Sequence, residues 1–410
     1  MAYRRFKVAV MRILMTTQPA PSHLRALVPA ALALRRRGHE LVVALPPMLH
    51  PVLISYGLEP IALGGWPDQE SATWHPPAAG SPADAAAGMW QMFAGPPVLH
   101  AARALIAAGH EWRPDLILRD SAQLAGALAA EALDIPHVSV QSTGTGSAPA
   151  IPGTQSLVEA LNAHRVALGL PRQATLAALF RHLHANLMPA SYDPALAGTP
   201  NTRCYRQRNP ARPDEVLPVW LAELPEARLL LFASVGTSFN RVPGRVEAFL
   251  AAVSELDCSA IVAAGPGQHV GALTTRSPHV RVVDEVPQPL LLECCDLFLT
   301  HGGFNSVRES LRLGVPMVIA PVAGDQLGNA RRCAELGVAH TFSEHLPDPA
   351  ALAHACREVL NDSGYHARAR AMQRQILALP PLDAFAADVE RVVGGVSPVS
   401  IAPTPTRGAV

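Results

Sequence analysis

The sequence predicts an α/β protein with two doubly wound parallel sheets, each flanked by helices. Three observations lead to this prediction. A chain of 410 residues, 49% of them hydrophobic, is too long for one ordinary core and apolar enough for two. Short apolar strands alternate with amphipathic helices twice along the chain, which is typical of parallel sheets with crossover helices. A stretch with four prolines, residues 209–225, separates the two sets.

The first set follows a second methionine, Met11, and we expect residues 1–10 to be an extension that the fold does not need. Its expected strands are 13–17, 40–45, 115–119 and 136–140, and its expected helices are 24–37 and 122–133. Residues 64–97 are rich in Gly, Pro and Ala and predict a long variable loop region. Residues 151–190 are predicted to be helical.

The second set repeats the pattern. Its expected strands are 229–235, 260–264, 280–283, 297–300 and 316–320. One expected helix ends at residue 253, and two others span 305–313 and 326–336. Open parallel sheets bind ligands beyond the carboxyl ends of their strands, so two such sheets predict a ligand cleft between them. The predicted organisation is an extension (1–10), a first domain (11–208), a linker (209–226), a second domain (227–378), a C-terminal helix that returns to the first domain (379–396) and a disordered tail (397–410).

Composition excludes several classes of function. Lys and Arg together number 33, as do Asp and Glu, and they are interspersed, so no basic surface for nucleic acid is expected. No stretch reaches the roughly 20 apolar residues of a membrane helix, and no signal peptide is recognisable. The cysteines lack metal-binding spacing, which favours a reducing compartment and a cytoplasmic location. They are Cys204, Cys258, Cys294, Cys295, Cys333 and Cys356.

The segment His301-Gly-Gly-Phe-Asn-Ser-Val-Arg-Glu309 joins an apolar strand to a helix through two glycines. Glycines permit close backbone approach, and the amides of a helix N-terminus can face an anion, so the segment has the form of a diphosphate site. Asn305, Ser306 and Glu309 would share one face of the helix. Taken alone, Ser306-x-x-Glu309 could equally be a capping box, with His301 a packed residue at a strand end.

A second polar group, Asp325-Gln326 followed by Asn329, comes after the next strand and favours a binding site. A carboxylate beside an amide can make paired hydrogen bonds with adjacent sugar hydroxyls. Together, Val286-Pro-Gln288, His301 to Glu309, Gly314-Val-Pro-Met317 and Asp325-Gln326 resemble the donor-binding signature of the UDP-glycosyltransferase superfamily, especially its bacterial macrolide and plant natural-product members. The signature extends over about forty residues with polar positions at fixed spacing, which is more specific than any glycine motif alone. This resemblance implies the GT-B fold, two Rossmann-like domains facing across a cleft.

The resemblance also implies roles for individual residues. The diphosphate would be contacted by His301, Asn305 and Ser306, and Gly303 would let the backbone come close to it. Glu309 would bind the ribose hydroxyls. Asp325 and Gln326 would hold the hexose, while Val286 and Gln288 would lie at the nucleoside end. Thr237 and Ser238 resemble a phosphate-contacting loop. Glu285 stands where plant members carry a tryptophan that stacks on uracil, so both UDP-hexose and dTDP-hexose donors stay open.

His23 follows the first predicted strand, at the turn where the family places its catalytic base. An inverting transfer needs a base that takes the proton of the acceptor hydroxyl, and imidazole has a suitable pKa. Asp120, at the end of another strand, resembles the family's carboxylate partner for that histidine. The alternatives are a packed or capping histidine for His23 and a helix N-cap for Asp120.

The chain has no Asp-x-Asp triplet and no cluster of metal ligands, so a mechanism with no metal and no cofactor is expected. We therefore expect an inverting glycosyltransferase that moves a hexose from a UDP- or dTDP-sugar to a hydroxyl of a small apolar aglycone, such as a polyketide, macrolide or phenolic compound. Variable regions near 64–100 and 141–190 would bind this acceptor. The expected oligomeric state is a monomer or homodimer. The alternatives are an epimerase or lipid-linked glycosyltransferase of the same architecture, and a non-catalytic auxiliary protein.

Overall fold

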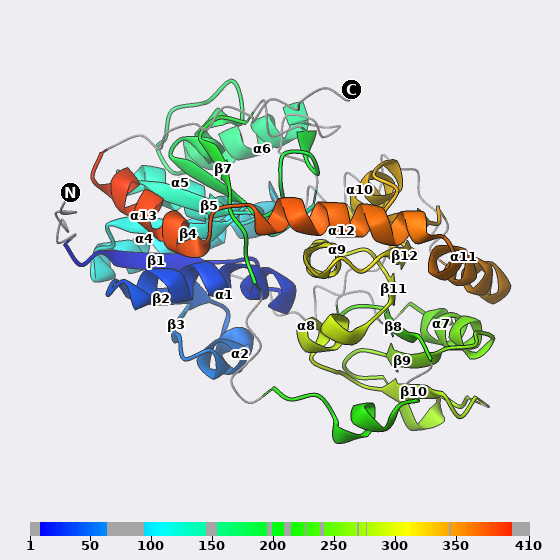
Figure 1. Cartoon of the computed structure of the whole chain (residues 1–410). Coiled ribbons are helices and arrows are strands. Elements are labelled where there is room, and N and C mark those ends of the chain that lie inside the picture. The colour runs from blue at the N-terminus through cyan, green and yellow to red at the C-terminus, as the bar shows by residue number, and fades with distance from the viewer. Residues whose placement is uncertain are drawn as a thin grey trace, which may run out of the picture. The chain divides into compact units, whose positions relative to one another are not determined.

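The computed structural model describes residues 9–63, 94–144, 154–194, 199–208, 215–225, 228–237, 242–268, 270–275, 277–343 and 346–395. The chain divides into two compact units (Figure 1). The first contains residues 1–142, 146–207 and 380–410, and the second contains residues 143–145 and 208–379.

The first unit contains a seven-stranded parallel sheet with the strand order β3-β2-β1-β4-β5-β6-β7. Its strands are β1 (Arg12–Thr16), β2 (Glu40–Leu45), β3 (Glu59–Ala62), β4 (Leu116–Asp120), β5 (His137–Val140), β6 (Leu183–Asn186) and β7 (Thr202–Cys204). Its helices are α1 (Pro21–Arg36), α2 (His50–Ser55), α4 (Pro96–Trp112), α5 (Leu124–Ala132), α6 (Thr154–Ala167) and α13 (Leu382–Val393). The strand order reverses between β1 and β4, so the loops that follow these two strands meet at one edge of the sheet.

The second unit contains a six-stranded parallel sheet with the order β10-β9-β8-β11-β12-β13. Its strands are β8 (Leu230–Ser234), β9 (Ser259–Ala263), β10 (Val280–Val283), β11 (Leu297–Thr300), β12 (Met317–Ile319) and β13 (Ala339–Thr341). Its helices are α7 (Arg245–Ser254), α8 (Gln288–Leu291), α9 (Phe304–Leu313), α10 (Asp325–Glu335), α11 (Pro349–Asn361) and α12 (Ser363–Leu377).

Each sheet packs against helices through its own apolar core. In the first unit, buried residues of the central strands pack against alanine-rich faces of α4 and α5. In the second unit, β8, β9 and β11 pack against α7 and α11. The predicted fold class, two doubly wound α/β units, is thereby confirmed, and no helix within the described residues is long and apolar enough to cross a membrane.

The C-terminal helix α13 returns to the first unit, as predicted, and packs against α1 (Figure 1, red). Two acidic residues hold it there, the buried Asp388 and the half-buried Glu390. Asp388 accepts hydrogen bonds from Tyr205 (2.6 Å) and Arg203 (2.5 Å), and Glu390 pairs with Arg37. Oε1 of Glu390 also lies 3.0 Å from Nε2 of His39. His39 therefore has a structural role, because it helps to hold the C-terminal helix on the first unit.

The prediction of helices throughout 151–190 is partly wrong. α6 lies in this range, but Leu183–Asn186 forms strand β6, which pairs with β5, and β7 follows at the sheet edge. The two strands have only 4 and 3 residues, and β6 carries polar His184 and Asn186, so the segment shows no apolar run. Pairing with β5, rather than local sequence, makes β6 a strand.

Candidate active site

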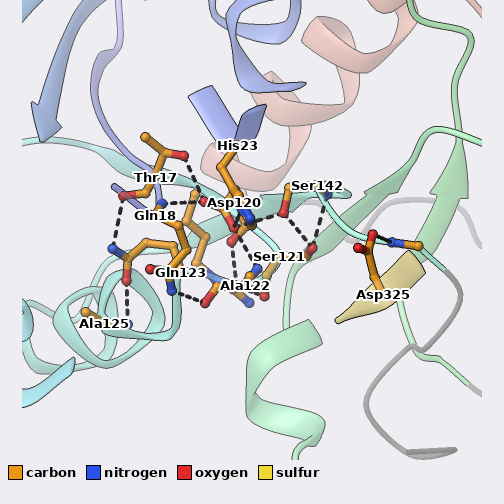
Figure 2. A network of polar contacts seen from close by, with 12 residues as sticks. Thr17, Gln18, His23, Asp120, Ser121, Ala122, Gln123, Ala125, Ser142 and Asp325 are labelled. Atoms are coloured by element: carbon orange, nitrogen blue, oxygen red, sulfur yellow. Dashed lines mark hydrogen bonds and ion pairs between the residues drawn. The ribbon is translucent and has the colours of Figure 1, made fainter. Parts of the chain in front are cut away.

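The carboxylate of Asp120 lies at the carboxyl end of β4 and is fully buried within a network of hydrogen bonds (Figure 2). Its Oδ2 atom accepts from the hydroxyl of Thr17 (2.8 Å) and the amide of Gln18 (2.6 Å), both in the loop after β1. Its Oδ1 atom accepts from the amide of Ala122 (2.7 Å) and the hydroxyl of Ser142 (3.0 Å). Four donors from three loops therefore fix the position of this carboxylate.

His23 lies in the first turn of α1, and its ring points toward Asp120 (Figure 2). The Nδ1 atom of His23 is 3.4 Å from Oδ1 of Asp120, and the histidine side chain is 14% exposed. Burial acts to raise the pKa of Asp120, but the neighbouring His23 and the hydrogen bonds from Gln18 and Thr17 outweigh it and lower that pKa to about 2. The carboxylate is thus ionised at neutral pH and suited to orient an imidazole.

The alternative function of Asp120 as the cap of the next helix is only partly supported. Its carboxylate accepts the amide of Ala122, but α5 begins at Leu124, and its N-cap is Gln123. The side-chain oxygen of Gln123 accepts from the amide of Ala125 at 3.0 Å. Asp120 therefore shapes the turn, while a different residue caps the helix.

His301 follows β11, and its ring lies close to two glycines. A Cβ atom on Gly236 would lie 2.5 Å from Cε1 of the ring, and one on Gly303 would lie 2.6 Å from Nε2. Gly236 also has a φ of 82°, which disfavours any other residue. Burial, together with the positive charge of Arg245, lowers the pKa of His301 to about 4. The ring is therefore neutral near pH 7 and can donate a hydrogen bond without carrying charge.

Three of the predicted donor residues meet on one face of α9. The Nε2 atom of Gln288, at the start of α8, donates to Oε2 of Glu309 at 2.8 Å and lies 3.5 Å from the hydroxyl of Ser306. Ser306 and Glu309 are almost fully buried. The capping-box alternative is wrong, because α9 begins at Phe304 with Gly303 as its N-cap, so Ser306 lies inside the helix.

Asn305 is half-buried, and its side-chain oxygen accepts from Nη2 of Arg308 at 3.0 Å. Val286, which with Gln288 is predicted to lie at the nucleoside end of the donor, is half-buried just before α8. Thr237 is exposed after β8, while Ser238 lies outside the described residues. Glu285, in the position of the aromatic residue of plant members, is exposed.

The predicted sugar-binding pair lies at the start of α10. Oδ2 of Asp325 accepts from the side-chain amide of Asn329 (3.1 Å) and from the backbone amide of Gly144 (3.0 Å). Gly144 belongs to the second unit, as Asp325 does. The oxygen of Gln326 accepts the amide of Val322 at 2.8 Å, so this side chain also shapes its own loop. The amide of Asn329 donates to the carbonyl of Gly302 at 3.0 Å, which links this pair to the His301 loop.

Two residues that organise the site were not predicted from the sequence. Thr17 and Ser142 bind Asp120, yet each is an ordinary polar residue in a loop. A polar residue close after an apolar strand was the only available signal: Thr17 directly follows β1, and Ser142 lies two residues after β5. Which strand ends meet depends on the order of strands in the sheet, and local patterns do not give that order.

Comparison with known proteins finds glycosyltransferases. Residues 247–392 match the family described as the C-terminal domain of erythromycin biosynthesis protein CIII-like proteins. The chain is 28% identical to L-demethylnoviosyl transferase of Streptomyces niveus, over 88% of this chain and 92% of that protein. It is 26% identical to tylactone mycaminosyltransferase of Streptomyces fradiae, over 93% and 92% of the two chains.

Solved structures show the same fold. The spinosyn rhamnosyltransferase SpnG, complexed with thymidine diphosphate, superimposes with a TM-score of 0.77 at 24% identity, over 93% of this chain and 100% of that one. The fold and the comparisons define a glycosyltransferase of the GT-B class. Within that class, the chain resembles the natural-product members of the UDP-glycosyltransferase superfamily.

Proposed function

We propose that this enzyme transfers a hexose, with inversion at the anomeric carbon, from a nucleoside diphosphate to a hydroxyl of a small apolar aglycone. The observation that carries the proposal is the 3.4 Å approach of His23 to the buried, ionised Asp120. An imidazole held through Nδ1 presents Nε2 as the proton acceptor. The same arrangement argues against the non-catalytic alternative, because a protein that only binds a nucleotide does not require a base oriented in this way.

In the proposed reaction, Nε2 of His23 takes the proton of the acceptor hydroxyl as its oxygen attacks the anomeric carbon. The new carbon–oxygen bond forms on one face of the sugar, and the bond to the β-phosphate oxygen breaks on the other. The electron pair of that bond leaves with the nucleoside diphosphate. Asp120 stabilises the imidazolium that results, which is the function of the carboxylate in comparable dyads.

The donor would bind in the second unit. The diphosphate lies against His301, the helix amides after Gly303 and the hydroxyls of Ser306 and Thr237, while Glu309 receives the ribose hydroxyls. Gln288 already donates to Glu309, so it orients the carboxylate that the ribose needs. Asp325 and Gln326 bind the hexose. Because neutral dipoles and helix amides meet the diphosphate, the proposed reaction needs no metal ion.

We further propose that the nucleotide is thymidine diphosphate. SpnG was solved with thymidine diphosphate, and this chain shares its fold. Glu285 is exposed and has no aromatic face on which uracil could stack. One of the relatives named above is a tylactone mycaminosyltransferase, and the acceptor in that name supports an apolar, antibiotic-like acceptor here.

The test is a transfer assay with a panel of macrolide, polyketide and phenolic aglycones, supplied with dTDP-glucose and UDP-glucose in parallel. We expect a glycoside with the anomeric configuration opposite to that of the donor, formed faster from the thymidine nucleotide. A retained configuration would contradict the inverting mechanism. Binding of both nucleotides without transfer to any acceptor would favour the auxiliary protein.

A further inference from the structure

Arg245, the first residue of α7, is a fully buried cation at the edge of the second sheet where the donor motif lies. Its guanidinium donates through Nη2 to the carbonyl of Ala320 and lies over the ring of Phe249, 5.1 Å from the centroid. Burial lowers the pKa of Arg245 to about 10, so the side chain stays charged at neutral pH.

Sheet register places this charge beside the His301 loop. Ala320 directly follows β12, and its amide donates to the carbonyl of Thr300 at 2.9 Å. Thr300 is the last residue of β11 and stands opposite Ser234 of β8. The carbonyl that binds Arg245 therefore belongs to Ala320, whose amide is hydrogen-bonded to Thr300, the residue directly before His301. The positive charge of Arg245 also helps to lower the pKa of His301, as a nearby cation should.

We propose that Arg245 is an electrostatic positioning residue for the donor diphosphate, an inference that rests on the proposed function. Its fixed charge has two effects. It adds to the effect of burial in keeping His301 neutral in the free enzyme, so that the ring acts as a hydrogen-bond donor, and it attracts the diphosphate to the His301 loop. In a buried setting such a charge acts strongly because little water screens it.

The same charge matters more as the reaction proceeds. When the bond between the anomeric carbon and the β-phosphate oxygen breaks, the leaving diphosphate gains one negative charge. A cation already held in place by Ala320 and Phe249 needs no rearrangement to stabilise that charge. Arg245 thus supplies a fixed positive charge to a site that we expect to function without a metal.

The test measures binding of thymidine, dTMP and dTDP, and of the uridine series, by calorimetry in the wild type, Arg245→Met and Arg245→Lys. We expect Arg245→Met to weaken dTDP binding about tenfold or more, the scale of one lost charge interaction in a partly buried site, and to leave thymidine binding within about threefold. Arg245→Lys should restore most of the dTDP affinity. Arg228→Met is the matched control, because Arg228 lies before the opposite end of β8 and pairs with Asp257.

A second readout is the titration of His301 by NMR. Its pKa should rise in Arg245→Met, because the repelling cation is gone, but stay below 6.5, because burial is the larger cause of its lowered value. Equal losses for thymidine and dTDP, no rescue by lysine, or an unchanged His301 pKa would overturn the inference and leave Arg245 a packing residue. If the wild type bound neither UDP nor dTDP, the proposed function itself would fail.

Discussion

The side chains of Gln288 and Glu309 are joined by a hydrogen bond of 2.8 Å between Nε2 and Oε2, which links the start of α8 to the middle of α9. The sequence separates these residues by strand β11 and the His301 loop. Ser306 lies 3.5 Å from the same Nε2 atom. Three of the predicted donor residues, Gln288, Ser306 and Glu309, are therefore in contact with one another.

Asp120→Asn should lower kcat by about a hundredfold or more while leaving the donor Kd nearly unchanged. The amide of Asn keeps the shape of the carboxylate but cannot stabilise an imidazolium on His23. Its N–H group would also face groups that donate hydrogen bonds to the carboxylate of Asp120 in the wild type. Steady-state kinetics and calorimetry measure the two quantities. Asp115→Asn is the control, since Asp115 lies before the opposite end of β4 and accepts the amide of Arg12. Equal rates for Asp120→Asn and the wild type would remove Asp120 from the mechanism.

Transfer should survive exhaustive chelation, because in the proposed mechanism helix amides and hydroxyls, rather than a metal, meet the charge of the diphosphate. The sequence carries no Asp-x-Asp triplet to hold a metal there. Initial rates are compared before and after dialysis against EDTA, with magnesium or manganese added back. Loss of activity that either ion restores would show that the enzyme needs a metal.

Asp325→Ala should reduce discrimination between glucose and its deoxy analogues while sparing affinity for free dTDP. A site that hydrogen-bonds sugar hydroxyls leaves buried polar groups unpaired when a hydroxyl is missing, at roughly 1–3 kcal/mol for each group. We would compare kcat/KM for glucose, 4-deoxyglucose and 6-deoxyglucose on one nucleotide, with Asp257→Ala as an exposed control. Equal use of all three sugars by the wild type, or loss of dTDP binding in Asp325→Ala, would assign the pair a different role.

Buried histidines in the first unit should make the protein sensitive to acid. Burial and the charge of Arg119 lower the pKa of His184 to about 3, and its Nδ1 lies 2.7 Å from the hydroxyl of Ser139. The unfolded chain binds this proton near pH 6.5, so stability is full above that pH and falls as the pH drops toward 3, by about 1.4 kcal/mol per pH unit. His137 acts in the same direction, because burial and Arg119 also lower its pKa.

Urea unfolding at pH 7.5, 6 and 5 would measure this dependence. His184→Gln cannot take up the proton and can still hydrogen-bond Ser139, so its loss of stability between pH 7.5 and 5 should be smaller than that of the wild type by about 2 kcal/mol. His110→Gln changes an exposed histidine at the end of α4 and should match the wild type. Parallel curves for all three proteins would contradict the assignment of His184.

The sequence was sufficient for the strand–turn–helix units that carry the site. Buried strands such as β11 and β4 are apolar runs that end in a polar residue, and turn glycines mark where the helices begin. It was insufficient for β6, whose four residues include His184 and Asn186 and become a strand only by pairing with β5. It could not predict that Thr17 and Ser142 both reach Asp120, because their meeting depends on β1, β4 and β5 being neighbours in the sheet.

The central claim, that His23 is the base of a glycosyl transfer, is tested most directly by single-turnover transfer with His23→Ala at saturating donor and acceptor. We predict a rate lowered by about a hundredfold or more, with dTDP affinity unchanged, because only the proton acceptor is lost. His110→Ala, which removes an exposed histidine of the same unit, should transfer at the rate of the wild type. A His23→Ala enzyme that transferred sugar at the wild-type rate would contradict the account.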